Sequence, residues 1–374
     1  MGDPASDALT KFGLVLFKEV IASSDSTVAL CPAAAASSLA TATACAKGET
    51  ASQLTSALGS AKGADLQTAV LKLQLAFSKP VAGAEVSLVH RAFTDKGVHL
   101  DENFVKSLES RFRCGVTRTD LRTSPESSAD AVNGWLSHAT GGRLAGLLRP
   151  DAIDPSSKMM LASAFYFRAS APPLLEPPFQ EMSDKLSFTP TMSTRVEVDG
   201  VCGVGQFLFG EMSEPPAKML EIQYKGGDTA LLLLLPDRVA KLKELKAKMS
   251  PAFLKTVLGR LNKKTVRVEL PKMTIDSHVV LNTHLFKMGV KQAFLDSADF
   301  SRLAPGGGVR LSDVVHKAVL VLDQGNVAAD DKKTSPTQDM KADVEFLVTR
   351  PFLFVLRRPG DDFMLLVGVV KAPQ

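Results

Sequence analysis

A long polar segment lies between apolar stretches near the C-terminal end of the chain, and it restricts the possible folds more than any other feature. Val314 to Leu322 is apolar and β-branched around His316, a pattern typical of a central strand. No apolar run occurs from Asp323 to Asp343, whereas Phe346 to Leu356 and Phe363 to Val370 again have the composition of buried strands. So long a polar loop between core strands is uncommon in a compact fold, and such loops are usually functional or disordered.

Composition and net charge limit the number of domains and the kinds of partner that the chain can have. The chain has 374 residues, 45% hydrophobic and 22% charged, which is enough for an ample core in two ordinary domains or in one large mixed fold. A net charge of +4 does not indicate a nucleic-acid partner, because that requires a concentrated basic face. The most basic stretch runs from Lys241 to Met249, backed by Lys263 and Lys264. Its lysines fall on more than one helical face, so we expect no polyanion site.

The reactive side chains form no pattern that indicates catalysis or metal binding. Cys31, Cys45, Cys114 and Cys202 are far apart and include no CxxC pair, so neither a disulfide framework nor a zinc site is expected. The histidines lack ligand spacing, and no GxSxG, HExxH, GxxxxGK[ST] or GxGxxG motif is present. We therefore expect no enzymatic activity, no metal and no cofactor.

The N-terminal residues and the hydropathy of the chain indicate the cellular compartment in which the protein is expected. The N-terminal residues are polar and acidic without a long apolar region, so no signal peptide is recognised. No run approaches the roughly 18 apolar residues of a transmembrane helix, and no Asn-x-Ser/Thr acceptor for N-glycosylation occurs. These features favour the cytoplasm or the nucleus and give no sign of a membrane partner. An extracellular location stays open if a leader was removed or if export is unconventional.

Several sequence blocks, in the same order along the chain, resemble the serpin family. SDVVHKAVL at 312–320, Gly325, RPFLF at 350–354 and LLVGVVKAP at 365–373 are similar to the hinge, loop and C-terminal strands of that family. The block at 46–50 and the helix around the only tryptophan also match. The resemblance implies one α+β domain over residues 1–374, with a large, mainly antiparallel sheet, two smaller sheets and about nine helices. It also implies an exposed reactive-centre loop at about residues 324–345.

The resemblance implies a function for this loop. In serpins the loop is bait for a protease, and after cleavage its N-terminal part inserts as a new strand into the main sheet and traps the acyl-enzyme. The implied partner is a serine, or alternatively a cysteine, endopeptidase, met by a monomeric inhibitor. Counting from Gly325 places the scissile bond at Asp339–Met340, within one or two residues. Asp339 suits caspase-like or granzyme-like proteases, Met340 elastase-like or chymotrypsin-like ones, and Lys341 trypsin-like ones.

The hinge of the loop departs from the pattern of inhibitory serpins, which carry small residues after the hinge glycine. Strand residues alternate between faces, so insertion buries either Asp330 with Lys332 or Asp331 with Lys333, and the resemblance selects the first pair. Burying an ion costs several kcal/mol, and about 1.4 kcal/mol in a barrier changes a rate tenfold. A non-inhibitory serpin that acts as a binding or carrier protein, or as a plain protease substrate, is therefore the alternative. The hinge residues are Asp323, Gln324, Gly325, Asn326, Val327, Ala328, Ala329 and Asp330.

Positions that the resemblance assigns to the opening region of the sheet also depart from the family. Cys31 and Ala34 stand where the family has serines, Ser163 stands where it has asparagine, and Ala171 replaces a tryptophan. The resemblance gives His316 a hydrogen-bonding role in this region, so these changes predict that the imidazole loses partners. Two alternatives stay open, namely that the substitutions compensate one another and that His316 is an ordinary satisfied core histidine.

Overall fold

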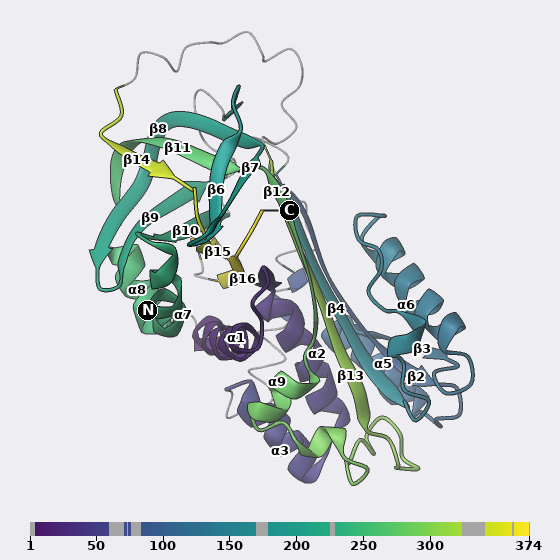
Figure 1. Ribbon diagram of the computed structural model, residues 1–374. Helices are drawn as coiled ribbons and strands as arrows, with labels where there is room; N and C mark the ends of the chain where they lie inside the picture. The colour runs from purple at the N-terminus through teal and green to yellow at the C-terminus, as the bar shows by residue number, and fades with distance from the viewer. Residues whose placement is uncertain are drawn as a thin grey trace.

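The structure of the chain is a computed structural model that describes residues 4–59, 71–72, 74–75, 84–169, 179–224, 229–323, 341–360 and 363–373. Eight α-helices fall within these ranges (Figure 1). They are α1 (Pro4–Ala22), α2 (Pro32–Cys45), α3 (Gly48–Ala57), α5 (Glu102–Phe112), α6 (Pro125–Ala139), α7 (Leu242–Lys248), α8 (Pro251–Gly259) and α9 (Asn282–Lys287). None of the helices in the described ranges is long and apolar enough to cross a membrane.

The largest sheet has nine strands in the order β1-β16-β15-β10-β9-β8-β11-β14, with β5 paired to β8. It is antiparallel except where β14 joins β11. The strands are β1 (Val28–Leu30), β5 (Gln180–Glu181), β8 (Gly200–Ser213), β9 (Pro216–Gln223), β10 (Ala230–Pro236), β11 (Asn262–Pro271), β14 (Val344–Leu347), β15 (Phe352–Arg358) and β16 (Phe363–Val370).

The second sheet has five strands in the order β12-β13-β4-β2-β3, and a two-stranded sheet joins β6 to β7. In the five-stranded sheet, β13 runs parallel to β4 and β3 runs parallel to β2. The strand that precedes the long polar segment, β13, therefore belongs to this mixed sheet rather than to the largest one. The strands are β2 (Ala84–Asp95), β3 (Gly115–Thr119), β4 (Met159–Ala169), β12 (Met273–Val280), β13 (Leu311–Leu322), β6 (Leu186–Thr191) and β7 (Thr194–Val198).

Helix α2 holds the two large sheets together. It contacts β2 and β4 of the five-stranded sheet and β16 of the nine-stranded sheet, and nearly all of its residues are buried. Its run of alanines, serines and threonines explains this position, because small side chains allow close approach on every side. Helix α6 covers the opposite face of the five-stranded sheet (Figure 1). Both faces of the central strands are thus buried, which agrees with their nearly continuous apolar sequence.

The predicted α+β class, with one large, mainly antiparallel sheet and two smaller ones, is confirmed. The interpretation of Phe346 to Leu356 as one buried strand is wrong, because the structure divides it into β14 and β15. Pro351 lies between them and has no N–H for a ladder, so the chain leaves one strand position before it reaches the next. β14 pairs with β11 at one edge of the sheet, whereas β15 lies between β10 and β16.

Candidate functional site

Strands β4 and β13 pair directly along nearly their whole length. Their parallel register aligns His316 with Ser163 and Val321 with Arg168. We call this paired boundary the seam. Most residues on both sides of the seam are buried, and the chain enters the long polar segment directly after β13. Any strand that entered the sheet here would have to replace the hydrogen bonds between β4 and β13.

His316 lies at the centre of the seam and has two hydrogen-bond partners. Its side chain is fully buried, and its Nε2 accepts from the backbone N–H of Cys31 at 3.0 Å. Because Nε2 accepts, the neutral ring carries its proton on Nδ1, which lies 3.0 Å from the hydroxyl oxygen of Ser163 and donates to it. The prediction that His316 loses its partners is therefore wrong. The imidazole is satisfied by the hydroxyl of Ser163, the side chain that stands in place of the family's asparagine, and by the backbone amide of Cys31, which does not depend on the side chain at that position.

A second buried histidine lies in the same row of the sheet. The register pairs His90 on β2 with Ser163, which in turn pairs with His316. Nε2 of Gln74 lies 3.3 Å from Nδ1 of His90. Burial lowers the pKa of His90 to about 4 and that of His316 to about 3, with a further contribution to the latter from nearby His278. Both rings are neutral at physiological pH.

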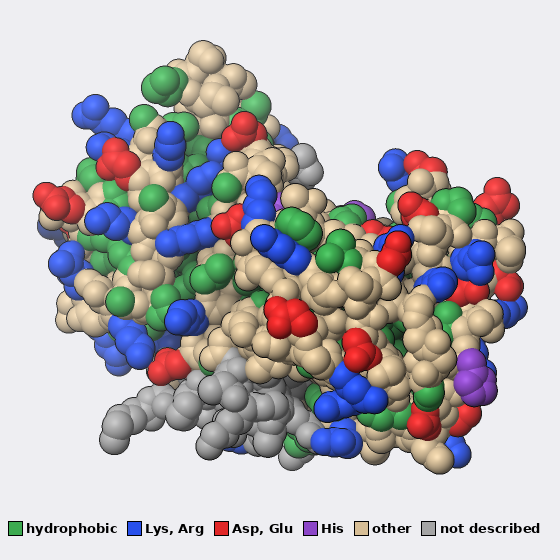
Figure 2. Space-filling view, turned by 90° about the horizontal axis from the view of Figure 1, so that it is seen from below, with side chains coloured by type: hydrophobic (Ala, Val, Ile, Leu, Met, Phe, Trp, Pro, Cys, Tyr) green, Lys and Arg blue, Asp and Glu red, His purple; other side chains and the backbone are tan. Residues whose placement is uncertain are grey.

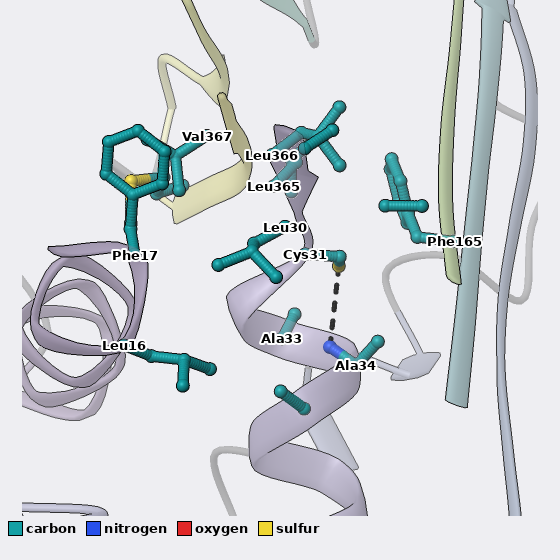
Figure 3. Close-up of a cluster of buried hydrophobic side chains, with 14 of the residues drawn as sticks. Leu16, Phe17, Leu30, Cys31, Ala33, Ala34, Phe165, Leu365, Leu366 and Val367 are labelled. Carbon is teal, nitrogen blue, oxygen red and sulfur yellow. Dashed lines mark hydrogen bonds between the residues drawn. The ribbon is translucent and has the colours of Figure 1, made fainter. Parts of the chain in front are cut away.

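Cys31 connects the start of α2 to the seam. It is the N-cap of that helix, and its Sγ accepts from the backbone N–H of Ala34 at 3.4 Å (Figure 3). Figure 3 shows this bond between Leu16 of α1 and Phe165 of β4. Burial raises the pKa of the Cys31 thiol to about 12, so the group is a neutral thiol. The structure thus joins Cys31, Ala34, His316 and Ser163 in one hydrogen-bonded chain.

An ion pair spans the seam at the end from which the polar segment departs. Nε and Nη2 of Arg168 donate to one carboxylate oxygen of Asp323 at 3.0 and 2.7 Å. The two side chains are 30% and 23% exposed, and this hydrogen bond raises the pKa of Arg168. Asp323 is one of the predicted hinge residues, whereas Arg168 was not predicted to belong to the site. The register of β4 against β13, which pairing rules alone do not give, was needed to find it.

The far end of the polar segment is attached to the other large sheet. The backbone N–H of Asp343 donates to the carbonyl oxygen of Thr265 at 2.8 Å, and a carboxylate oxygen of Asp343 accepts from the N–H of Thr265 at 3.0 Å. β14 then continues parallel to β11. The segment therefore starts at the seam of the five-stranded sheet and ends at an edge of the nine-stranded sheet. Lys341, near this second attachment, is exposed.

Several predicted residues lie outside the part of the chain that the structure describes. They are the hinge from Gln324 to Asp330, the predicted scissile pair Asp339 and Met340, and Ala171. Asp323 and Lys341 are described, with the positions given above. All four cysteines are free thiols. Among the described residues, no group of three His, Cys, Asp or Glu side chains could hold a metal ion.

Three features define the class of protein. The N-terminus of α2 is buried against a seam of two parallel strands, the long polar segment follows β13 at that seam, and the chain rejoins a second sheet at β14. This is an α+β protein with a long loop between its two large sheets. The family Serpin (serine protease inhibitor) matches residues 7–373. The chain belongs to the serpin family.

Named relatives and a solved structure agree with this assignment. The chain is 27% identical to Iris of Ixodes ricinus in an alignment of 376 residues, which covers 98% of each sequence. It is 26% identical to the leukocyte elastase inhibitor of Bos taurus in an alignment of 341 residues, which covers 88% of each sequence. The structure of human thyroxine-binding globulin with bound thyroxine superposes with a TM-score of 0.88 at 22% identity, covering 99% of this chain and 98% of that one. This last likeness shows the fold.

Proposed function

We propose that this serpin inhibits an endopeptidase by presenting the segment at about 324–345 as a substrate and then inserting its first part into the seam. The observation that carries the proposal is the position of Asp323, directly after β13 and beside a seam with no strand between its two sides. A chain that turns back from β13 runs antiparallel to β13 and hence to β4. Insertion would replace one parallel ladder by two antiparallel ladders, and antiparallel pairing is slightly more stable per residue.

The proposed target follows from the sequence of the segment and from the relatives. The leukocyte elastase inhibitor of Bos taurus is named for the inhibition of a protease, and over most of its length this chain resembles it. We propose Asp339–Met340, or the bond beside Lys341, as the site of cleavage by a serine or cysteine endopeptidase. The chain would act as a monomer, without catalysis of its own and without a cofactor.

A non-inhibitory carrier is the second candidate, and the charges of the hinge favour it. In the register that the family resemblance selects, insertion buries Asp330 and Lys332. The desolvation of two ions slows insertion unless they pair with good geometry, and a slow loop is cleaved as a substrate. Human thyroxine-binding globulin, whose fold this chain shares, has a structure with bound thyroxine. The likeness to thyroxine-binding globulin is one of fold.

The experiment compares two charge-removing double variants in the hinge. Asp330→Ala with Lys332→Ala removes the charges predicted to face inward, and Asp331→Ala with Lys333→Ala is the matched control on the other face. Each protein is incubated with trypsin-, elastase-, chymotrypsin- and caspase-type enzymes, and denaturing gels separate trapped complex from cleaved chain. We expect a trapped complex with one class of enzyme. The inward variant should raise the ratio of complex to cleaved chain about tenfold, and the control should not.

One outcome of this experiment excludes inhibition. If every class of enzyme turns over both the natural chain and the inward variant without a trapped complex, the hinge charges are not the obstacle and the loop does not insert in time. The carrier would then be the better account. An equal gain for both double variants would contradict the proposed register.

A further inference from the structure

A groove of about 750 Å³ lies on the nine-stranded side of the molecule, away from the residues assigned to the seam and the loop. It is lined by the C-terminal part of α1, by α7 and by the residue that follows β16. Ile21, Leu242 and Pro351 are buried apolar residues of its lining. The volume falls within the range of about 300–1,000 Å³ that is usual for small-molecule sites.

The charge around this groove is unbalanced. Four lysines line it, whereas Asp25 is the one acidic residue of the lining. Nζ of Lys371 lies 4.0 Å from a carboxylate oxygen of Asp25, whose side chain is fully exposed. Figure 2 shows Lys and Arg side chains across this face of the molecule, including the left side, on which Figure 1 places α7 and α8. The lining lysines are Lys18, Lys243, Lys246 and Lys371.

Lys246 shows the effect of this crowding most clearly. Its Nζ lies 3.5 Å from the carbonyl oxygen of Ile21, and the side chain is only partly exposed. Burial and the charges of Lys371 and Lys243 lower the pKa of Lys246, against the opposing effect of Asp25. The positive charges are therefore held close to apolar surface with too few carboxylates to neutralise them. An anion that entered the groove would reduce this repulsion.

We propose that this basic groove binds a small amphipathic anion, with one carboxylate or sulfonate group among the lysines and an apolar body against Ile21, Leu242 and Pro351. A polyanion fits less well, because α7 directs only Lys243 and Lys246 into the groove, three positions apart on one helical face. Lys18 and Lys371 come from distant parts of the chain. The four lysines therefore meet around one groove instead of following a single helix as a long basic track.

The test uses anilinonaphthalene sulfonate, a fluorescent aromatic sulfonate, titrated into the full-length protein at low ionic strength. We expect one saturable site. Lys243→Gln with Lys246→Gln should weaken its affinity about tenfold or more, because each lysine provides a charged hydrogen bond to the sulfonate. Lys248→Gln with Lys263→Gln is the matched control, since these lysines are exposed, lie outside the lining and give the same change in net charge. The control should bind the dye normally.

A second variant and a second dye distinguish binding in the groove from non-specific binding of the dye to apolar surface. Ala247→Trp should block the groove without a change in charge, because Ala247 is an exposed residue of its lining. N-phenylnaphthylamine lacks the sulfonate and should bind at least about tenfold more weakly. Equal loss of affinity in both lysine pairs, normal binding by the tryptophan variant, or equal binding of the neutral dye would each overturn the proposal. None of these variants touches the loop or the seam, so the result is independent of protease inhibition.

Discussion

Asp323 lies 2.7 Å from Nη2 of Arg168, and this contact ties the residue from which the polar segment departs to the opposite strand of the seam. A strand that entered between β13 and β4 would have to separate the two side chains. The ion pair therefore belongs to the closed form of the sheet. It is well placed to oppose premature opening.

The first prediction concerns the strength of this ion pair. In a double-mutant cycle of Arg168→Ala and Asp323→Ala, the coupling contribution to the free energy of unfolding should be about 0.5–1 kcal/mol, since both side chains are partly exposed to water. Urea unfolding of the four proteins measures it. The cycle of Arg310 and Asp296, an ion pair with a fully exposed carboxylate beside the opposite end of β13, is the control and should give less. A coupling of zero for the first pair would mean that it does not hold the seam.

The second prediction concerns the dependence of stability on pH. Burial holds the pKa values of His90 and His316 near 4 and 3, below the value of about 6.5 in the unfolded chain. The unfolded chain then takes up protons first as the pH falls. The stability that the neutral rings provide is complete above about pH 6.5 and is lost as the pH falls toward 3. Each ring should add a slope of up to about 1.4 kcal/mol per pH unit.

Denaturant unfolding between pH 7 and pH 5 checks this slope. His316→Gln and His90→Gln should each remove about half of the added slope, whatever their effect on stability at pH 7. His138→Gln, on the exposed surface of α6, is the control for the histidine-to-glutamine exchange itself. A stability that stays constant over this pH range would contradict the assignment of neutral, buried rings.

The third prediction concerns the hydroxyl of Ser163. Ser163→Ala leaves the Nδ1–H group of His316 without this acceptor inside a fully buried site, and the expected loss is about 1–3 kcal/mol. Ser163→Asn retains a side-chain acceptor and should be less harmful, provided that the larger group fits. Thermal unfolding ranks the variants. Equal stability of Ser163→Ala and the natural protein would show that the hydrogen bond contributes little.

The fourth prediction concerns the cap of α2. Sulfur is a weak acceptor and serine is among the preferred N-cap residues, so Cys31→Ser should stabilise the protein by about 0.5–1 kcal/mol. Cys31→Ala removes the acceptor and should act in the opposite direction. Both retain the backbone N–H that donates to His316. If serine and alanine give the same stability, Sγ of Cys31 does not act as a cap.

The elements were largely predictable from sequence, whereas their contacts were not. The apolar run around His316 predicted a central strand, and β13 lies between β12 and β4. Pro351, which interrupts the nearby apolar stretch between β14 and β15, is a local signal in the sequence against one continuous strand. The partners of His316 were predicted wrongly, because one of them is the backbone amide of Cys31, which does not depend on the type of side chain at that position.

The contacts across the seam and around the basic groove depend on tertiary register. Arg168 and Asp323 are far apart in sequence, and only the pairing of Val321 with Arg168 brings their strand ends together. Likewise, the lysines at 243 and 246 were visible as part of a basic stretch, but Lys18 and Lys371 join them only in the folded chain. Sequence patterns specify which face of an element is buried, and they leave open which distant element covers it.

The most direct test of loop insertion is the melting temperature of the protein after a single cut in the polar segment. Limited proteolysis near Asp339–Met340 supplies the nicked protein, and mass spectrometry locates the cut. If the freed segment enters the seam, about ten new backbone hydrogen bonds of about 1 kcal/mol each should raise the melting temperature by roughly 13 °C. An unchanged melting temperature would contradict insertion and, with it, the proposed mechanism of inhibition.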